Sequence, residues 1–141
     1  TMNEVRAVQG IVIAHGSLAD GMLDAVRRIT GTEGGLRAIS NTGLGPDTLA
    51  ERVRSYLEDG PAILFTDLKS GSCGMVAHRL LRDRNDLHVM AGFNLAMLLA
   101  FVMHRTQPVE QLLPLLLEKG RAAIGCSPEL VSHDADRTAA H

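Results

Sequence analysis

The sequence predicts an α/β fold: a doubly wound, mainly parallel sheet of four strands with helices on both faces. Short apolar runs alternate with helical stretches along the whole chain, which is the pattern of parallel strands joined by right-handed helical crossovers. The runs GIVIA and AILFT are continuously apolar rather than alternating, as expected of strands that are buried on both faces.

The first half of the chain contains two strand–helix pairs. In the first helix, Met22, Val26 and Ile29 recur at helical spacing. The second helix is amphipathic, with Leu49 and Val53 on its apolar face. The expected strands span residues 10–14 and 36–39, and the expected helices span residues 17–29 and 47–57.

The second half continues the alternation and ends in helices. The helix at residues 94–104 is apolar nearly all round, which predicts that it is buried. Pro114 and Gly120 predict a bend or break in the last helix. The expected strands span residues 62–66 and 87–91, and the expected helices span residues 72–82, 94–104 and 109–124.

Length and composition predict one domain. The chain has 141 residues, of which 45% are hydrophobic, enough for one core and too few residues for two ordinary domains. We expect this domain to cover residues 1–125. Residues 126–141 are polar and are expected to fray or to add an extra edge strand, with ELVSH at 129–133 as the candidate.

Several functional classes are disfavoured by composition. The formal net charge is −2 and no block of Lys and Arg stands out, so nothing suggests nucleic-acid binding. The longest apolar stretch, residues 95–103, is too short to insert across a membrane. Cys73 and Cys126 are isolated and give neither a disulfide framework nor a zinc signature. A cytoplasmic protein without a cofactor or metal is the simplest interpretation.

The strand order 2-1-3-4 of flavodoxin-like sheets places a candidate site between the first and third strands. Ligands of open parallel sheets bind beyond the carboxyl ends of the strands, where the strand order reverses. His15 follows the first strand and Asp67 follows the third, so the two side chains are expected side by side. Helix N-termini near Ser17 and Ser72 add backbone N–H groups that favour anions.

This pairing suggests phosphoryl transfer through a histidine. If Asp67 accepts a hydrogen bond from one ring nitrogen of His15, the other nitrogen keeps its lone pair as a nucleophile. The reaction then needs in-line positioning and stabilisation of the charged oxygens. The candidate phosphate-binding residues are those of the two loops: Gly16, Ser17, Ser70, Gly71 and Ser72.

Structural roles are an alternative for each of these residues. His15 is equally consistent with packing at a strand end, and Asp67 with capping a loop. Asp20 fits a capping box with Ser17. Cys73 near a helix start fits either an inert small residue or a thiol of lowered pKa. The other five histidines show no ligand spacing and are interpreted as surface or structural residues: His78, His88, His104, His133 and His141.

Three segments together resemble a known family. GIVIAHGSLADGM, AILFTDLKSGSC and VMAGFNLAMLLAFV are similar to the IIA component of the mannose family of the bacterial phosphoenolpyruvate:sugar phosphotransferase system, over roughly residues 10–124. The resemblance implies that His15 takes a phosphoryl group from the phosphocarrier protein HPr and passes it to a separate IIB component. It also implies that Asp67 bonds the ring Nδ1, that Ser72 helps to hold the phosphoryl group and that Asn94 caps a helix.

The resemblance further implies a homodimer, which in known examples exchanges a C-terminal strand. The chain departs from the family at two places. The usual loop after the aspartate is Gly-Gly-Ser-Pro, whereas residues 70–73 are Ser-Gly-Ser-Cys; the lost glycine is expected to restrict the backbone and the lost proline to leave the first helical turn less preset. The tail after Ile124 matches poorly.

Two other functions remain open from the sequence. The same fold and histidine suit a regulatory binding module whose phosphorylation state selects a partner without sugar transport. The segment VIAHGS also resembles the strand end of small tetrapyrrole metal chelatases, in which the histidine handles a metal. That motif is short, and Asp67 with its serine-containing loop fits phosphate better.

Overall fold

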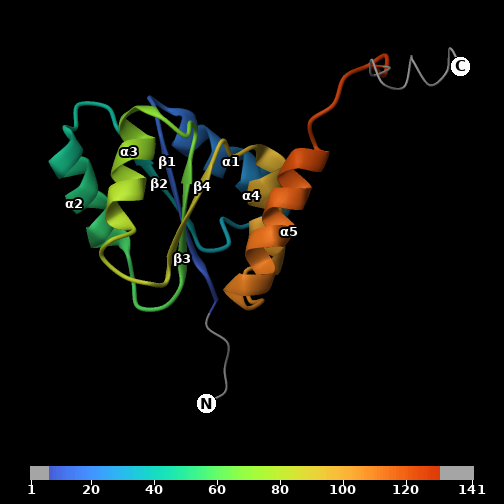
Figure 1. Ribbon diagram of the computed structural model, residues 1–141. Helices are drawn as coiled ribbons and strands as arrows, with labels where there is room; N and C mark the ends of the chain where they lie inside the picture. Colours follow the sequence, from blue (N-terminus) through green and yellow to red (C-terminus); the bar gives the residue numbers. More distant parts are fainter. Residues whose placement is uncertain (1–6, 131–141) are drawn as a thin grey trace, which may run out of the picture.

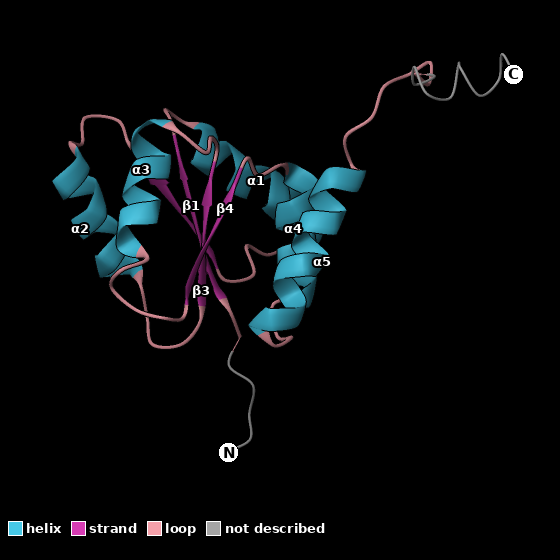
Figure 2. Ribbon diagram, in the orientation of Figure 1, coloured by secondary structure: helices cyan, strands magenta, loops and turns pink. Residues whose placement is uncertain are grey.

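The computed structural model describes residues 7–130, and this part of the chain forms a four-stranded sheet between two helical layers (Figures 1 and 2). All strand pairs are parallel and the order is β2-β1-β3-β4, as predicted. The strands are β1 (Gln9–Ala14), β2 (Leu36–Ser40), β3 (Ala62–Thr66) and β4 (Leu87–Ala91). The helices are α1 (Leu18–Thr30), α2 (Pro46–Tyr56), α3 (Gly71–Leu80), α4 (Leu95–His104) and α5 (Val109–Ala122).

The two faces of the sheet carry separate cores. Helices α2 and α3 cover one face, and α1, α4 and α5 cover the other (Figure 1). The side chains of β1 alternate between the cores, with Val12 in the α4 layer and Ile13 in the α3 layer. Because both faces are covered, β3 is buried at every position. This burial is what the continuously apolar runs predict.

The larger core is packed around two aromatic rings. The rings of Phe65 and Phe101 meet edge to face with centroids 5.4 Å apart, and both residues are fully buried. Gly10 lies beside them, where an added Cβ would approach the Phe101 ring to 2.9 Å and Leu36 Cδ2 to 2.7 Å. Since a buried ring has no room to withdraw, this position of β1 needs glycine for space.

Several expectations about the helices are corrected by the structure. Helix α4 is buried along one side only, and Met103 on its other side is 72% exposed, because only one side of α4 faces the sheet and α5. Ile29 is exposed as well, so Leu23 and not Ile29 joins Val26 in the buried stripe of α1. Helix α5 runs unbroken through Pro114; proline removes one backbone hydrogen bond there without ending the helix.

The end of the described chain carries no strand. Residues 126–130 follow α5 without regular structure, and residues 131–133 of the candidate strand ELVSH lie outside the described residues. The division into residues 1–125 and a tail therefore stays a prediction. Within residues 7–130, every helix is too short or too polar to cross a membrane.

The packing around Gly10 gives a first prediction. Gly10→Ala is expected to lower the free energy of unfolding by about 1–3 kcal/mol, since the new methyl group overpacks a filled core. Gly21→Ala is the matched control: Gly21 lies in α1 with nothing within 4 Å of an added Cβ, and alanine there should add about 0.4–1 kcal/mol. Urea denaturation measures both, and equal effects of the two changes would contradict the packing described here.

Candidate active site

The candidate site lies at the carboxyl edge of the two central strands. His15 follows Ala14 at the end of β1, and Asp67 follows Thr66 at the end of β3. The register pairs Ile13 with Thr66, so Asp67 lies one step before His15 along the paired strands and the two residues leave the sheet close together. The structure thus brings together the pair that the sequence predicts, at the point where the strand order reverses.

Asp67 holds the backbone and the ring of His15 at the same time. Asp67 Oδ2 accepts a hydrogen bond from the His15 backbone N–H at 3.0 Å and lies 2.8 Å from His15 Nδ1. The second carboxylate oxygen accepts a hydrogen bond from the Leu68 N–H at 3.0 Å. An ionised carboxylate only accepts hydrogen bonds, so Nδ1 carries the proton and Nε2 of the neutral ring keeps its lone pair.

Exposure and charge differ sharply between the two side chains. The Asp67 side chain is 11% exposed and the His15 side chain is 45% exposed. Burial on its own raises the pKa of Asp67, but the hydrogen bonds from the His15 backbone, the His15 ring and the Leu68 N–H together lower that pKa below its ordinary value. The site therefore pairs an ionised, sheltered carboxylate with a ring that solvent reaches.

Gly71 lies against the free edge of the histidine ring. A Cβ at Gly71 would lie 3.7 Å from His15 Cε1 and 3.9 Å from Nε2, in the space beside the nitrogen that keeps its lone pair. Gly71 also has φ +83°, a conformation that favours glycine. Ser70 has φ −105° and extended backbone, which serine adopts readily. The expected restriction from the lost glycine is therefore absent, because the left-handed position of the loop is still a glycine.

Ser72 is held by a residue that the sequence interpretation missed. Asn41, directly after β2, donates a hydrogen bond from Nδ2 to Ser72 Oγ at 3.0 Å. The Asn41 backbone N–H donates to the Ala14 carbonyl at 3.2 Å, which fixes the loop beside β1. Because Ser72 Oγ accepts the amide proton, its own hydroxyl proton is free to donate elsewhere. The available signal was an amide residue ending the neighbouring strand at the same edge of the sheet.

Two helices begin at the site without side-chain caps. Ser17 precedes α1 and Ser70 precedes α3, and neither serine bonds the first turn through its hydroxyl. Asp20 is exposed and the expected capping box with Ser17 is not formed. Gly16, with φ +60°, turns the chain from His15 into α1. Both helices thus direct the positive, N-terminal end of the helix dipole at the site.

Cys73 packs directly against the histidine. Its Sγ lies 3.9 Å from His15 Nδ1 and the residue is fully buried in the core beneath α3. Burial and the charge of Asp67 raise the pKa of the Cys73 thiol, which contradicts the alternative of a lowered pKa. His15, Asp67 and Cys73 each place one atom of a metal-ligating type within 4.8 Å of the others.

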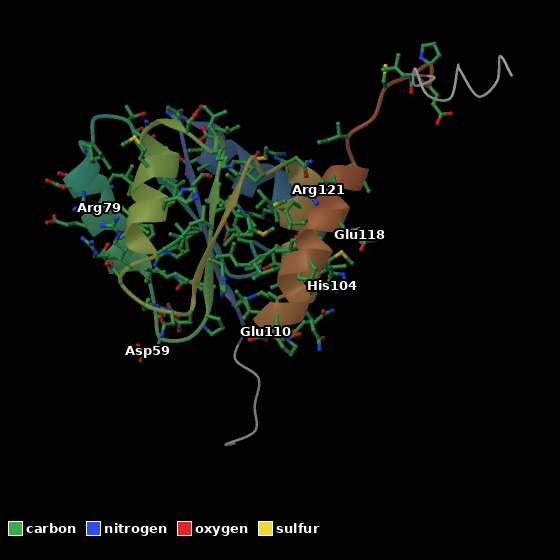
Figure 3. All side chains as sticks on the ribbon, in the orientation of Figure 1. Asp59, Arg79, His104, Glu110, Glu118 and Arg121 are labelled. Atoms are coloured by element: carbon green, nitrogen blue, oxygen red, sulfur yellow. The ribbon has the colours of Figure 1, made fainter. Side chains whose placement is uncertain are left out.

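Of the five histidines interpreted as surface or structural residues, His133 and His141 lie outside the described residues and His88 lies in β4. The remaining two have hydrogen-bond partners of their own. His78 Nδ1 bonds the Gly74 carbonyl within α3 at 2.7 Å. His104, labelled in Figure 3, is the last residue of α4, and its ring bonds Gln107. The next residue, Arg105, accepts a hydrogen bond from the Val8 N–H directly before β1, so His104 lies near the amino edge of the sheet, whereas His15 follows the carboxyl end of β1. Asn94 caps α4 as expected, accepting a hydrogen bond from the Met97 N–H at 3.0 Å.

The fold and the site define a class: small α/β proteins that present a carboxylate-oriented histidine at a topological switch point, beside two helix N-termini. A family model described as PTS system fructose IIA component, EIIA-man, matches residues 10–113. The chain therefore belongs to the EIIA-man family of the sugar phosphotransferase system, and it is a component of sugar phosphotransfer. This match favours the phosphotransferase interpretation over the chelatase alternative.

Solved structures show the same fold. The phosphotransferase system component EIIA from Streptococcus agalactiae is 25% identical with a TM-score of 0.79, covering 84% of this chain and 96% of that one. The mannose/sorbose-specific IIA subunit from Enterococcus faecalis is 24% identical with a TM-score of 0.77, covering 89% and 99%. The IIA protein associated with the fucose utilization operon of Streptococcus pneumoniae is 17% identical with a TM-score of 0.75, covering 89% and 96%. The curated proteins include no significant match.

The hydrogen bond from His15 to Asp67 predicts a defined tautomer. At a pH at which the ring is neutral, ¹⁵N NMR should find the His15 proton on Nδ1. Asp67→Ala should lose this preference, because no acceptor then holds the proton on Nδ1. A tautomer that is the same in both proteins would show that Asp67 does not orient the ring.

Proposed function

We propose that this chain is a phosphohistidine carrier, in which His15 accepts a phosphoryl group from phosphorylated HPr and passes it to a separate IIB component. The observation that carries the proposal is the contact of 2.8 Å between His15 Nδ1 and Asp67 Oδ2. It leaves Nε2 as the nitrogen with a lone pair, on a half-exposed ring that a partner protein can reach. Membership of the EIIA-man family supports the same activity.

The transfer step needs no cofactor. The Nε2 lone pair attacks phosphorus in line, the new N–P bond forms, and the bond from phosphorus to the donor's histidine nitrogen breaks with its electron pair left on that nitrogen. The ring then carries positive charge, which ionised Asp67 stabilises through the Nδ1–H. Transfer to the next partner reverses these changes, with the partner's nucleophile attacking phosphorus and Nε2 leaving with its electron pair.

The two loops supply donors for the phosphoryl oxygens. In this proposal Asn41 orients the Ser72 hydroxyl, which donates one hydrogen bond to a phosphoryl oxygen. The backbone of Ser70 and Gly71 lines the space beside Nε2. Gly16 and Ser17 place the N-terminus of α1 on the other side. Neutral donors and helix ends fixed before the reaction stabilise the charge that develops on the oxygens.

The proposed setting is the one that the family resemblance leads us to expect. The chain works in the cytoplasm as a homodimer, with residues 1–125 as one IIA-type domain and HPr and a separate IIB component as its partners. A chain that is phosphorylated but passes nothing to any IIB component would instead have the regulatory role that the sequence leaves open. Transfer of ³²P from the phosphorylated chain to IIB components of the same cell separates the two.

Phosphorylation at His15 is tested by intact-mass spectrometry. Incubation with phosphoenolpyruvate, enzyme I and HPr should add a mass on the order of 80 Da, one phosphoryl group. His15→Ala should gain nothing, whereas His104→Ala, a matched control near the amino edge of the sheet, should gain the same mass as the wild type. No gain in the wild type, or a gain retained in His15→Ala, would refute the proposal.

The role of Asn41 is tested by reversing its hydrogen bond. In Asn41→Asp the carboxylate accepts the Ser72 proton, so the hydroxyl is turned away from the phosphoryl group. We expect phosphorylation of His15 to slow by about 10- to 100-fold, at or below the usual loss of one transition-state donor. Asn41→Asp should have much less effect in a Ser72→Ala background, since no hydroxyl is left to misdirect. Equal slowing in both backgrounds would mean that Asn41 acts through charge and not through Ser72.

A further inference from the structure

The proposed transfer leaves one contact of the site unused. The Cys73 thiol lies in the first turn of α3, fully buried, with Sγ 3.9 Å from His15 Nδ1. The family resemblance leads to an expected proline at this position, where this chain has cysteine. Phosphoryl transfer through Nε2 requires nothing from a sulfur atom on the Nδ1 side of the ring.

The three side chains have nearly the separations of a zinc site. Zn–S distances of about 2.3 Å and Zn–N or Zn–O distances of about 2.0–2.2 Å, at tetrahedral angles, put neighbouring ligand atoms roughly 3.3–3.8 Å apart. Here Nδ1 lies 2.8 Å from Asp67 Oδ2 and 3.9 Å from Cys73 Sγ, and all three ligand atoms lie within 4.8 Å of one another. Turning the half-exposed His15 ring changes the two separations that involve Nδ1, and turning the Asp67 carboxyl group changes its separation from Cys73 Sγ.

We propose that His15 Nδ1, an Asp67 carboxylate oxygen and Cys73 Sγ form a binding site for a thiophilic divalent cation of the zinc class. A thiolate, an imidazole and a carboxylate are the ligands that zinc prefers, and hard cations such as Mg²⁺ select against the thiolate. His15 is 45% exposed, so the ion enters from the solvent side and keeps water as its fourth ligand. Binding displaces the Cys73 thiol proton to solvent.

The bound cation would switch off the nucleophile. It takes the Nδ1 lone pair, so the one remaining proton of the neutral ring lies on Nε2. An Nε2 that carries a proton has no lone pair with which to attack phosphorus. Cation binding and phosphoryl acceptance therefore exclude each other at the same ring. This consequence rests on the proposed function, whereas the cation site itself does not.

Cadmium absorption tests the site without any phosphoryl transfer. Titration of the chain with Cd²⁺ should give the ultraviolet charge-transfer band of a cadmium thiolate, saturating at one ion per chain. Cys126 is the matched control because it is the other cysteine and is exposed after α5. The band should persist in Cys126→Ser and disappear in Cys73→Ser. A band lost with Cys126, one retained without Cys73, or no band at all would overturn the proposal.

A second variant keeps the test decisive if Cys73→Ser does not fold. His15→Gln changes a half-exposed side chain and leaves both cysteines in place. It should weaken Cd²⁺ binding at least tenfold, because it removes the nitrogen ligand. Unchanged affinity would show that the ion binds elsewhere and would overturn the site.

The inhibitory consequence is measured separately. One equivalent of Zn²⁺ should slow phosphorylation of the wild-type chain by HPr at least tenfold, and a chelator should restore the rate. Zinc should slow Cys126→Ser equally. Zinc that binds without slowing phosphorylation would overturn ligation through Nδ1. A wild-type chain that HPr never phosphorylates would refute the proposed function and this consequence together, while the cadmium titration would still decide the site.

Discussion

The structure of this site depends on one carboxylate. Asp67 Oδ2 accepts a hydrogen bond from the His15 backbone N–H and lies 2.8 Å from His15 Nδ1. A single oxygen therefore fixes both the backbone position of His15 and the orientation of its ring. A hydrogen bond to an ionised group contributes about 1.5–3 kcal/mol, more than a neutral one, and shelter from solvent strengthens it. The interactions with His15 and Leu68 together outweigh the desolvation of Asp67, because its pKa is lowered despite its burial.

The sheet makes this interaction possible. Strands β1 and β3 are neighbours in register although 52 residues separate His15 from Asp67 in the chain. Their burial between two helical layers leaves little conformational freedom at the strand ends. His15 and Asp67, the residues directly after these strands, are therefore held in place as well. Gly71 then leaves the space beside Nε2 open. Rigidity on the Nδ1 side and open space on the Nε2 side are what a reversible nucleophile needs.

Sequence patterns predicted the contacts that are set by the order of the strands and missed contacts between segments that lie beyond the strand ends. The ranges 62–66 and 87–91 agree with β3 and β4, because apolar runs between turn residues have clear ends, and the parallel order then placed His15 beside Asp67. The contact between Asn41 and Ser72 escaped because it joins a loop to the first turn of α3, and no local pattern encodes how these two segments approach each other. The contact between Cys73 and the His15 ring escaped for the same reason. The burial of α4 was overestimated because hydrophobicity alone does not show which side of a helix meets the sheet.

The most direct test of this account asks which ring nitrogen carries the phosphoryl group. Two-dimensional ¹⁵N NMR of the chain phosphorylated through HPr distinguishes phosphorus on Nε2 from phosphorus on Nδ1 of His15. The account predicts phosphorus on Nε2, with the Nδ1 proton still held by Asp67. Phosphorus on Nδ1, or on any residue other than His15, would contradict it.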